Sequence, residues 1–429
     1  MNLCPIVAVV GFAAVACGVQ EGPADVTGDW VGTITTKGNV TTVVNESGSV
    51  WGGTATLVEE ASIGVEAGAN EYMFGNIAAV YASADRIYVV DDQVPIVRSY
   101  DLDGNFINVI GGAGEGPGEY RRPQFIGGTD DGRIFVEADS NRMNVYSPSG
   151  ESLADFEAPA YCCNQPTIVT ANGIVYRTTA DFDRAVMLPS YTVQGFTEVG
   201  AVGDPIEVPN LPYERLTVAF FGTQRPFVPF APAFVWNMTR AGSLVVGTSD
   251  RYRFEIRHAG GSSLIVERNV DAVAVLAEER EPRRKLLVAA FNGATAPSFT
   301  WDGASMPDHK PAFGRFVPAY SGELWVIREG PSTSIDGCVE DPYMYQSLVP
   351  RDTTGHSDRS QSIPCWRSKP LVDVFDAEGV YLGEVEIPDG MKIWEGDLFV
   401  SQDVLVATHE DEAGTLYVKR YRLVLPGER

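Results

Sequence analysis

The sequence predicts an all-β chain folded as a six-bladed β-propeller, with the ring closed by an N-terminal strand and one short helical insertion. The main observation is a pattern of short strands and a Gly turn that is written twice. The first copy runs from Arg86 to Gly104 and the second from Arg133 to Gly150. The two arginines are 47 residues apart and the two glycines 46 apart. A period of this size is typical of a propeller blade.

The second observation is that related strand patterns recur along the rest of the chain. The third repeat is faint, which leaves five and seven blades as alternatives to six. A Pro-rich excursion, Pro205 to Pro232, separates the third repeat from the fourth. The expected blades run from Phe74 to Ile110, Phe125 to Phe156, Thr167 to Gly200, Phe234 to Glu267, Phe313 to Gly379 and Asp397 to Val424.

The third observation is a spare strand ahead of the first blade. Asn39 to Asn45 alternates and is rich in β-branched residues, which is typical of a strand. The sixth repeat has three strands, so we expect Asn39–Asn45 to complete it. Residues 18–38 are expected to be a tether, so the propeller domain is expected to span 39–429. The helical signal is Leu276 to Phe291, where Pro282 indicates a kink or a helix start.

The first seventeen residues are expected to be a targeting segment. Pro5 to Ala16 is apolar but too short to span a bilayer. The small residues before Cys17 suit signal peptidase cleavage and resemble a bacterial lipobox, in which Cys17 takes the lipid. Position 14 is Ala rather than Leu, and no Lys or Arg precedes the apolar run. We therefore expect a lipid-anchored protein outside the cytoplasm, with plain secretion and a cytoplasmic location as alternatives.

The remaining cysteines suggest one disulfide. Cys338 and Cys365 bracket a polar, irregular stretch, and an exported chain with such a pair favours a bridge. Closing that loop stabilises the fold by roughly 3–4 kcal/mol in the chain-entropy model. The adjacent Cys162 and Cys163 could form a strained bridge or stay as buried thiols. Zinc is disfavoured, because neither pair has the Cys-x-x-Cys spacing.

Composition limits the partners. The chain of 429 residues has a formal net charge of −25, which argues against binding nucleic acid through its phosphates. With 44% hydrophobic residues it is globular. No stretch after the N-terminal segment is apolar for long enough to span a membrane. We expect a monomer that meets the membrane through the lipid anchor alone.

The best-preserved repeat carries a family resemblance. Gly111 to Tyr120, Asp131 to Val136 and Asp139 to Gly150 resemble an NHL repeat. Residues 39–429 as a whole resemble the six-bladed β-propeller proteins common among exported bacterial lipoproteins. The resemblance implies the fold and an extracytoplasmic location. It implies little about chemistry, because propellers host lyases, hydrolases, oxidoreductases and binding platforms.

Catalytic motifs are weak. The Gly-x-Gly pattern within Gly112 to Gly116 is followed by Pro117 and Pro123, so no helix starts there and a dinucleotide site is disfavoured. No Gly-x-Ser-x-Gly elbow is present. The catalytic residues are therefore unknown from the sequence.

Carboxylates that follow the second strands of blades are the better site candidates. At one rim of the ring they could bind Ca²⁺ through oxygen ligands, or each could accept backbone N–H groups in its own turn. The neighbouring arginines would pair with them or bind an anion, and His409 could approach the channel. The candidate rim residues are Asp91, Asp92, Asp139, Arg142, Asp250, Arg251 and His409.

The sequence thus favours a non-catalytic propeller that binds an unknown protein or small-molecule ligand. The insertions at 205–232 and 331–370 would shape the binding surface. The alternative is a lyase or hydrolase of the NHL-like kind with a metal in the central channel.

Overall fold

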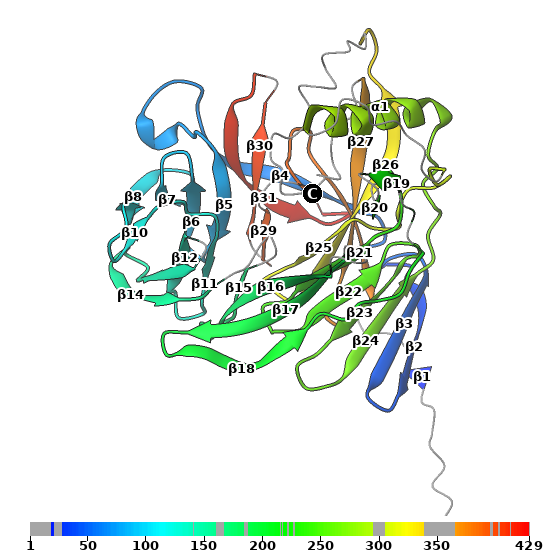
Figure 1. Cartoon of the computed structure of the whole chain (residues 1–429), viewed down its shortest axis with the longest axis horizontal. Coiled ribbons are helices and arrows are strands. Elements are labelled where there is room, and N and C mark those ends of the chain that lie inside the picture. The colour runs from blue at the N-terminus through cyan, green and yellow to red at the C-terminus, as the bar shows by residue number, and fades with distance from the viewer. Residues whose placement is uncertain are drawn as a thin grey trace, which may run out of the picture.

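The structure is a computed structural model in which the chain forms a ring of β-sheets (Figure 1). Among the residues that the structure describes there is one long helix, and the remaining regular structure is almost entirely strand. The residues that it describes are 19–20, 28–139, 141–159, 167–183, 188–214, 216, 218–220, 223–225, 228–294, 305–338, 365–394, 398–401, 404–411 and 413–428.

Six four-stranded blades make up the ring, which confirms the predicted fold class. In each blade the strands run antiparallel from an inner to an outer strand. Blade one is β5 (Ile77–Ala82), β6 (Arg86–Asp91), β7 (Ile96–Asp101) and β8 (Phe106–Ile110); blade two is β11 (Ile126–Gly128), β12 (Ile134–Asp139), β13 (Arg142–Tyr146) and β14 (Ser152–Glu157).

The faint third repeat is a full blade in the structure, with a long hairpin in its middle. Blade three is β15 (Ile168–Val169), β16 (Val175–Asp183), β17 (Leu188–Thr197) and β18 (Gly200–Glu207). Blade four is β21 (Phe234–Met238), β22 (Leu244–Thr248), β23 (Arg253–Arg257) and β24 (Ser263–Arg268). Blade five is β25 (Arg315–Pro318), β26 (Leu324–Ser334), β27 (Trp366–Phe375) and β28 (Tyr381–Glu386).

Blade six joins the two ends of the ordered chain. It consists of β29 (Leu398–Val400), β30 (Leu405–Glu410), β31 (Leu416–Val424) and, as the outer strand, β4 (Thr54–Ile63). β4 pairs antiparallel with β31 from Ile63 opposite Val418 to Thr56 opposite Val424. The prediction of an N-terminal closing strand is therefore confirmed, but its assignment to Asn39–Asn45 is wrong. The alternation in β4 is weaker because Glu59 and Glu60 are exposed on it.

The strand predicted at 39–45 covers blade four instead. β3 (Val40–Ser47) pairs parallel with the outer strand β24, and β2 (Val31–Lys37) pairs antiparallel with β3. A two-residue strand, β1 (Val19–Gln20), adds to β2. Regular structure is therefore present within the segment 18–38 that the sequence assigned to a tether. β2 reads Val-Gly-Thr-Ile-Thr-Thr-Lys, so its β-branched residues are a strand signal that the tether assignment overlooked.

We call residues 28–63 the N-terminal belt, because they run along the outer side of three blades. After β3 the backbone N–H groups of Val50 and Trp51 donate to Tyr381 and Leu382 of blade five, at 3.2 and 2.8 Å. The start of β4 then pairs parallel with β28 before it completes blade six. The belt thus links blades four, five and six.

Asn45 fastens the belt at the junction of blades four and five. It is 3% exposed. Its Oδ1 accepts from Trp30 Nε1 and from the Tyr381 backbone N–H, each at 2.8 Å. Its Nδ2 donates to the carbonyl oxygens of Glu267 at 3.2 Å and Gly379 at 3.1 Å. All the hydrogen-bonding capacity of this amide is therefore used inside the protein.

Repeated glycine turns set the distance between neighbouring blades. Gly104, Gly150 and Gly379 have φ of 87°, 89° and 84°, in the left-handed region that favours glycine. A Cβ on each would lie 2.7–3.1 Å from a side chain of the preceding blade's outer strand: Ile63, Ile110 and Val266. These glycines are needed both for the turn and for close blade packing.

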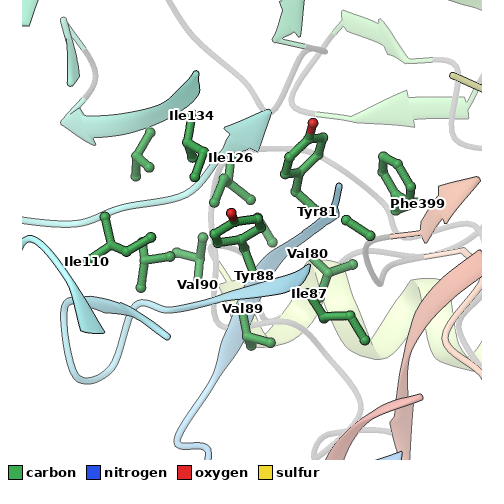
Figure 2. Close-up of a cluster of buried hydrophobic side chains, with 14 of the residues drawn as sticks. Val80, Tyr81, Ile87, Tyr88, Val89, Val90, Ile110, Ile126, Ile134 and Phe399 are labelled. Carbon is green, nitrogen blue, oxygen red and sulfur yellow. The ribbon is translucent and has the colours of Figure 1, made fainter. Parts of the chain in front are cut away.

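The hydrophobic core lies between the blades rather than at one centre. Separate clusters fill the junctions of blades two and three, three and four, four and five, and five and six. The largest cluster joins blades six, one and two (Figure 2). It includes Ile87, Tyr88 and Val90 of blade one, Ile134 of blade two and Phe399 of blade six. Each blade therefore depends on both neighbours for burial.

The remaining elements lie in connections between blades. The predicted helix is present as α1 (Ala277–Ala294), and Pro282 lies in its second turn rather than at its start. Within the described ranges, no helix combines the length and hydrophobicity needed to cross a lipid bilayer. Cys338 and Cys365 form the disulfide that the sequence predicts, with Cα atoms 5.3 Å apart. The short elements are η1 (Asn70–Tyr72), β9 (Gly112–Ala113), β10 (Glu119–Tyr120), β19 (Val218–Phe220) and β20 (Thr223–Arg225).

We expect Asn45→Ala to destabilise the protein by about 2–4 kcal/mol, because it leaves several buried donors and acceptors without a partner. The midpoint of urea unfolding measures this. Asn39→Ala is the matched control, since the side chain of Asn39 is exposed and donates to the Gly261 carbonyl. Equal effects of the two substitutions would contradict the role of Asn45.

Candidate functional site

The two ends of the ring differ. We call the end at which the inner strands β5, β11, β15, β21, β25 and β29 begin the insertion face, because the connections between blades lie there. One such connection contains α1, which lies beside the ends of β26 and β27 (Figure 1). The hairpin of β26 and β27 also extends from this face and carries the disulfide. We call the opposite end the floor.

Asp91 ends β6 at the insertion face and is fully buried. Its carboxylate accepts backbone N–H groups of Gly75, Asn76, Gln93 and Val94 at 3.0–3.3 Å. It also accepts from Arg98 Nη1 at 3.1 Å. The carboxylate of Asp91 therefore accepts from groups of blade one. This is the second possibility that the sequence left open, in which each Asp accepts N–H groups in its own turn.

Asp92 and Asp139 are also engaged locally. Asp92 Oδ1 accepts from Asn76 Nδ2 at 2.6 Å, and its other oxygen lies 3.9 Å from Arg122 Nε. Asp139 Oδ1 accepts the backbone N–H groups of Asn141 and Arg142 at 2.9 and 3.1 Å. The Asp139 side chain therefore stabilises the turn between the second and third strands of its blade. Asp92 contacts the neighbouring residues Asn76 and Arg122.

Arg142 closes the Gly-rich loop between blades one and two. Its guanidinium donates to the carbonyl oxygens of Glu115, Gly116 and Glu119 at 3.0–3.1 Å. The Glu119 carboxylate accepts from Gly116 N–H at 2.8 Å within the same loop. Arg142 therefore holds a loop through its two terminal nitrogens, Nη1 and Nη2.

Asp250 and Arg251 lie in the turn between β22 and β23, and both are exposed. Arg253 N–H donates to the Arg251 carbonyl at 2.8 Å. These two side chains remain open to solvent at the insertion face. They are the members of the predicted rim set that are most accessible to a ligand.

His409 lies in β30 and is 4% exposed. Its Nε2 lies 2.6 Å from the Tyr421 hydroxyl. Burial lowers the pKa of His409 to about 4, and Lys419 adds to this shift. The histidine is therefore neutral at physiological pH and packs within blade six.

The described residues do not assemble the predicted calcium site. No group of three or more His, Cys, Asp or Glu side chains that could hold a metal is present among them. Asp91, Asp139 and Asp250 hold equivalent positions in three blades, but each belongs to its own turn. Cys17, Cys162 and Cys163 lie outside the described residues.

A cluster at the floor brings five blades together. Arg240, after β21 of blade four, donates to the Gly128 carbonyl of blade two at 2.9 Å and lies 2.9 Å from Asp130. The same guanidinium lies 4.7 Å from the ring centre of Tyr320 in blade five. Tyr320 contacts Tyr81 of blade one and Phe399 of blade six, with ring centres 5.6 and 4.6 Å apart.

Two of these aromatic side chains are almost completely buried. Tyr81 and Phe399 are each 6% exposed, and their rings meet edge to face at 5.2 Å (Figure 2). Burial raises the pKa of Tyr81 to about 12, although Arg240 opposes the shift. We call Arg240, Tyr81, Tyr320 and Phe399 the floor plug, because they fill the end of the ring where the inner strands finish.

A second buried cluster attaches α1 to blade five. Lys310 Nζ donates to the Gly330 carbonyl at 2.8 Å and to Ser332 Oγ at 2.7 Å. It also lies 3.8 Å from Glu279 Oε2 of α1 and 3.7 Å from Glu329 Oε2 of β26. Burial lowers the pKa of Lys310, while the two carboxylates oppose this effect. The ion set fixes the helix on the insertion face.

The same cluster contains a strained residue. Phe230 has φ of 60°, which is rare for a bulky side chain. Its ring lies 5.9 Å from Lys310 Nζ and 5.2 Å from the Arg283 guanidinium carbon. Strain of this kind persists where the surroundings determine the conformation. The connection before blade four is thus held by α1 and by Lys310.

A third buried cluster joins blades four and five. Asp373 is fully buried and accepts from Arg268 Nη1 at 2.8 Å and Arg328 Nε at 2.9 Å. The hydroxyls of Tyr252 and Tyr381 donate to it at 2.7 and 3.2 Å. Sequence reasoning missed all three clusters, because their members come from separate strands and connections and form no motif. The one available signal was the presence of charged residues within otherwise apolar strands.

Comparisons with known proteins agree with this architecture. A family model described as DUF5128, a 6-bladed beta-propeller, matches residues 68–187. These residues cover blades one and two and the start of blade three. No curated protein matches the chain. The chain is a six-bladed β-propeller.

Solved structures that resemble it are distant in sequence. A DUF4221 family member from Bacteroides vulgatus is 10% identical, with 87% of this chain and 99% of that chain covered and a TM-score of 0.46. A candidate exported protein from Bacteroides fragilis is 8% identical, with 85% and 94% covered and a TM-score of 0.43. A virginiamycin B lyase from Staphylococcus aureus is 10% identical, with 82% and 95% covered and a TM-score of 0.31. Similarity at this level does not assign a ligand or a reaction.

We expect His409→Gln to flatten the loss of stability in acid. A folded-state pKa of about 4 means that the neutral histidine stabilises the protein above pH 6.5, and that this contribution is lost as the pH falls toward 4. The difference between pH 7 and pH 4.5 amounts to about 2–3 kcal/mol. Urea unfolding at several pH values measures it, with His258→Gln, which alters an exposed histidine, as the control. Identical pH profiles for His409→Gln and the unmodified protein would contradict this account.

Proposed function

We propose that this chain is an exported, lipid-anchored propeller that binds a protein or small-molecule ligand on its insertion face and has no catalytic role. The observation that carries the proposal is the asymmetry of the ring. One end bears α1 and the disulfide-closed hairpin, whereas the other is filled by the floor plug. Binding sites of propellers and related scaffolds are usually built from such loops on a rigid frame.

The chemistry of the described side chains supports binding rather than catalysis. A catalytic acid, base or nucleophile needs access to a substrate and unused hydrogen-bonding capacity. Asp91, His409 and Lys310 are each buried and engaged in local contacts. Asp250 and Arg251, which are exposed, can contact a ligand without further rearrangement.

The N-terminal sequence supports the proposed lipid anchor. Signal peptidase cleavage before Cys17 would leave that cysteine as the lipidated first residue. Cys17 lies two residues before Val19 of β1, which pairs with β2 of the belt. A lipid on Cys17 would therefore hold the ring close to the membrane surface.

A pair of photo-crosslinking variants tests the binding face. We expect p-benzoylphenylalanine in place of Glu278, an exposed residue of α1, to give a discrete crosslinked product in intact cells. The same group in place of Glu378, an exposed residue of the turn between β27 and β28, should give little or none. The comparison is made on immunoblots after irradiation.

Two results would overturn this proposal. Equal crosslinking at both positions would remove the distinction between the two ends of the ring. One equivalent of Ca²⁺ retained by the purified protein after dialysis, with Asp91→Asn and Asp139→Asn abolishing it, would favour the metal-dependent lyase or hydrolase instead.

Lipidation is tested separately. We expect mass spectrometry of the membrane-extracted protein to find Cys17 as the first residue, carrying a diacylglyceryl thioether. Cys17→Ser should move the protein out of the membrane fraction. A mature protein that begins after a cleaved signal but carries no lipid would indicate plain secretion, and would leave the binding proposal intact.

A further inference from the structure

The outer edges of the blades are protected in different ways. The edge of β24 is covered by β3, and the edge of β28 by β4. The other outer strands, β8, β14, β18 and β4, are open along all or part of their length in the described chain. Such edges present unpaired N–H and C=O groups that another strand can use, and proteins commonly guard them with charges or proline.

Three of the open edges carry such guards. Asp155 and Glu157 are exposed on β14. The edge strand β18 contains exposed Asp204, Pro205 and Glu207, and β4 contains exposed Glu59 and Glu60. Each of these strands would place charges or a proline against any added strand, which disfavours pairing.

The outer strand of blade one lacks every such guard. β8 reads Phe-Ile-Asn-Val-Ile and contains neither a charge nor a proline. Ile107 and Val109 are 42% and 45% exposed. No strand pairs with its outer side in the described part of the chain. Bonds outside the ladder lie at the two ends of the strand: Phe106 N–H donates to the Tyr72 hydroxyl at 3.0 Å, and the Ile110 carbonyl accepts from the Tyr120 hydroxyl at 3.2 Å.

The charges next to β8 are acidic. Residues 101–110 contain two charged side chains, Asp101 and Asp103. Asp103 is exposed, and backbone and side-chain hydrogen bonds from Asn105 hold the pKa of Asp101 below its usual value. The chain as a whole carries a formal charge of −25. A second copy of this chain would be repelled, whereas a segment with Lys or Arg would be attracted.

We propose that the outer edge of β8 binds an extended, Lys- or Arg-bearing segment of another protein by main-chain pairing. The five-residue edge extends about 17 Å and would add the segment as a fifth strand of blade one. Ile107 and Val109 would cover apolar side chains at alternate positions of the segment. This surface lies on the side of the ring and is separate from the insertion face.

The proposal is tested with a defined probe, a fluorescein-labelled peptide of alternating Lys and Val. We expect its fluorescence anisotropy to rise on titration with the mature protein. The double substitution Ile107→Ser and Val109→Ser should weaken binding by about tenfold or more, because two apolar contacts are lost while the charge is unchanged. Leu153→Ser on the guarded strand β14 is the matched control and should have no effect, since Leu153 is similarly exposed at 50%.

Two controls separate strand pairing from simple charge attraction and from misfolding. A peptide with Pro in place of the central Val retains the charge but cannot pair along the edge, so it should bind at least about tenfold more weakly. Circular dichroism and the urea midpoint establish that the variants are folded, and Ile107→Thr provides a milder substitution.

Several outcomes would overturn the proposal. These are the absence of binding by the Lys–Val peptide, equal binding of the Pro peptide, or equal binding by the Ser double variant. Sedimentation that shows a dimer abolished by Ile107→Ser and Val109→Ser would identify a second copy as the occupant instead.

Discussion

Closure of the ring by β4 is the constraint on which the structure depends. The core is divided among the junctions between blades, so an open ring would expose one junction completely. β4 prevents this by placing a strand from the beginning of the chain beside β31 from its end. The contact joins residues about 360 apart, and loop closure over that distance is entropically costly. The belt reduces the freedom of this segment by fastening it first to blades four and five.

The belt and the buried charges act at the same junction. Asn45 bonds to Gly379 and Tyr381, and the Tyr381 hydroxyl donates to Asp373. Asp373 in turn accepts from Arg268 and Arg328 of two different blades. Buried ion pairs contribute little net stability, but loss of one partner is severely destabilising. This junction therefore fixes the relative position of blades four and five more than it adds to overall stability.

The sequence predicted what local patterns determine. Alternation and Gly turns located nearly all strands of blades one, two, four, five and six, because each strand shows one face to a neighbouring blade. The sequence pattern of blade three was weak because its strands β16 and β17 are long and β16 carries buried polar residues, Arg177 and Thr178. The closing strand was misassigned because Asn39–Asn45 has the stronger β pattern, while pairing partners depend on the assembled ring.

The candidate site was less predictable for a related reason. An Asp after a second strand has the same local pattern whether it accepts turn N–H groups, as Asp139 does, or binds a ligand. Asp91 and Asp139 hold equivalent positions in two blades, but these positions are spread around the ring. Each side chain therefore stays with its own turn. The floor plug shows the opposite case, in which Arg240 and Tyr320 meet without any motif.

The surfaces proposed here for recognition lie apart from the polar groups that the ring needs for its own stability. Asp91, Asp373 and Lys310 are required to hold turns, junctions and α1. The exposed side chains of the insertion face and the unguarded edge of β8 make no comparable contribution to closure. A scaffold that uses its buried charges for structure can vary such surfaces freely, since changes there leave the junctions between blades intact. The same separation explains how a propeller can take a new partner without losing its fold.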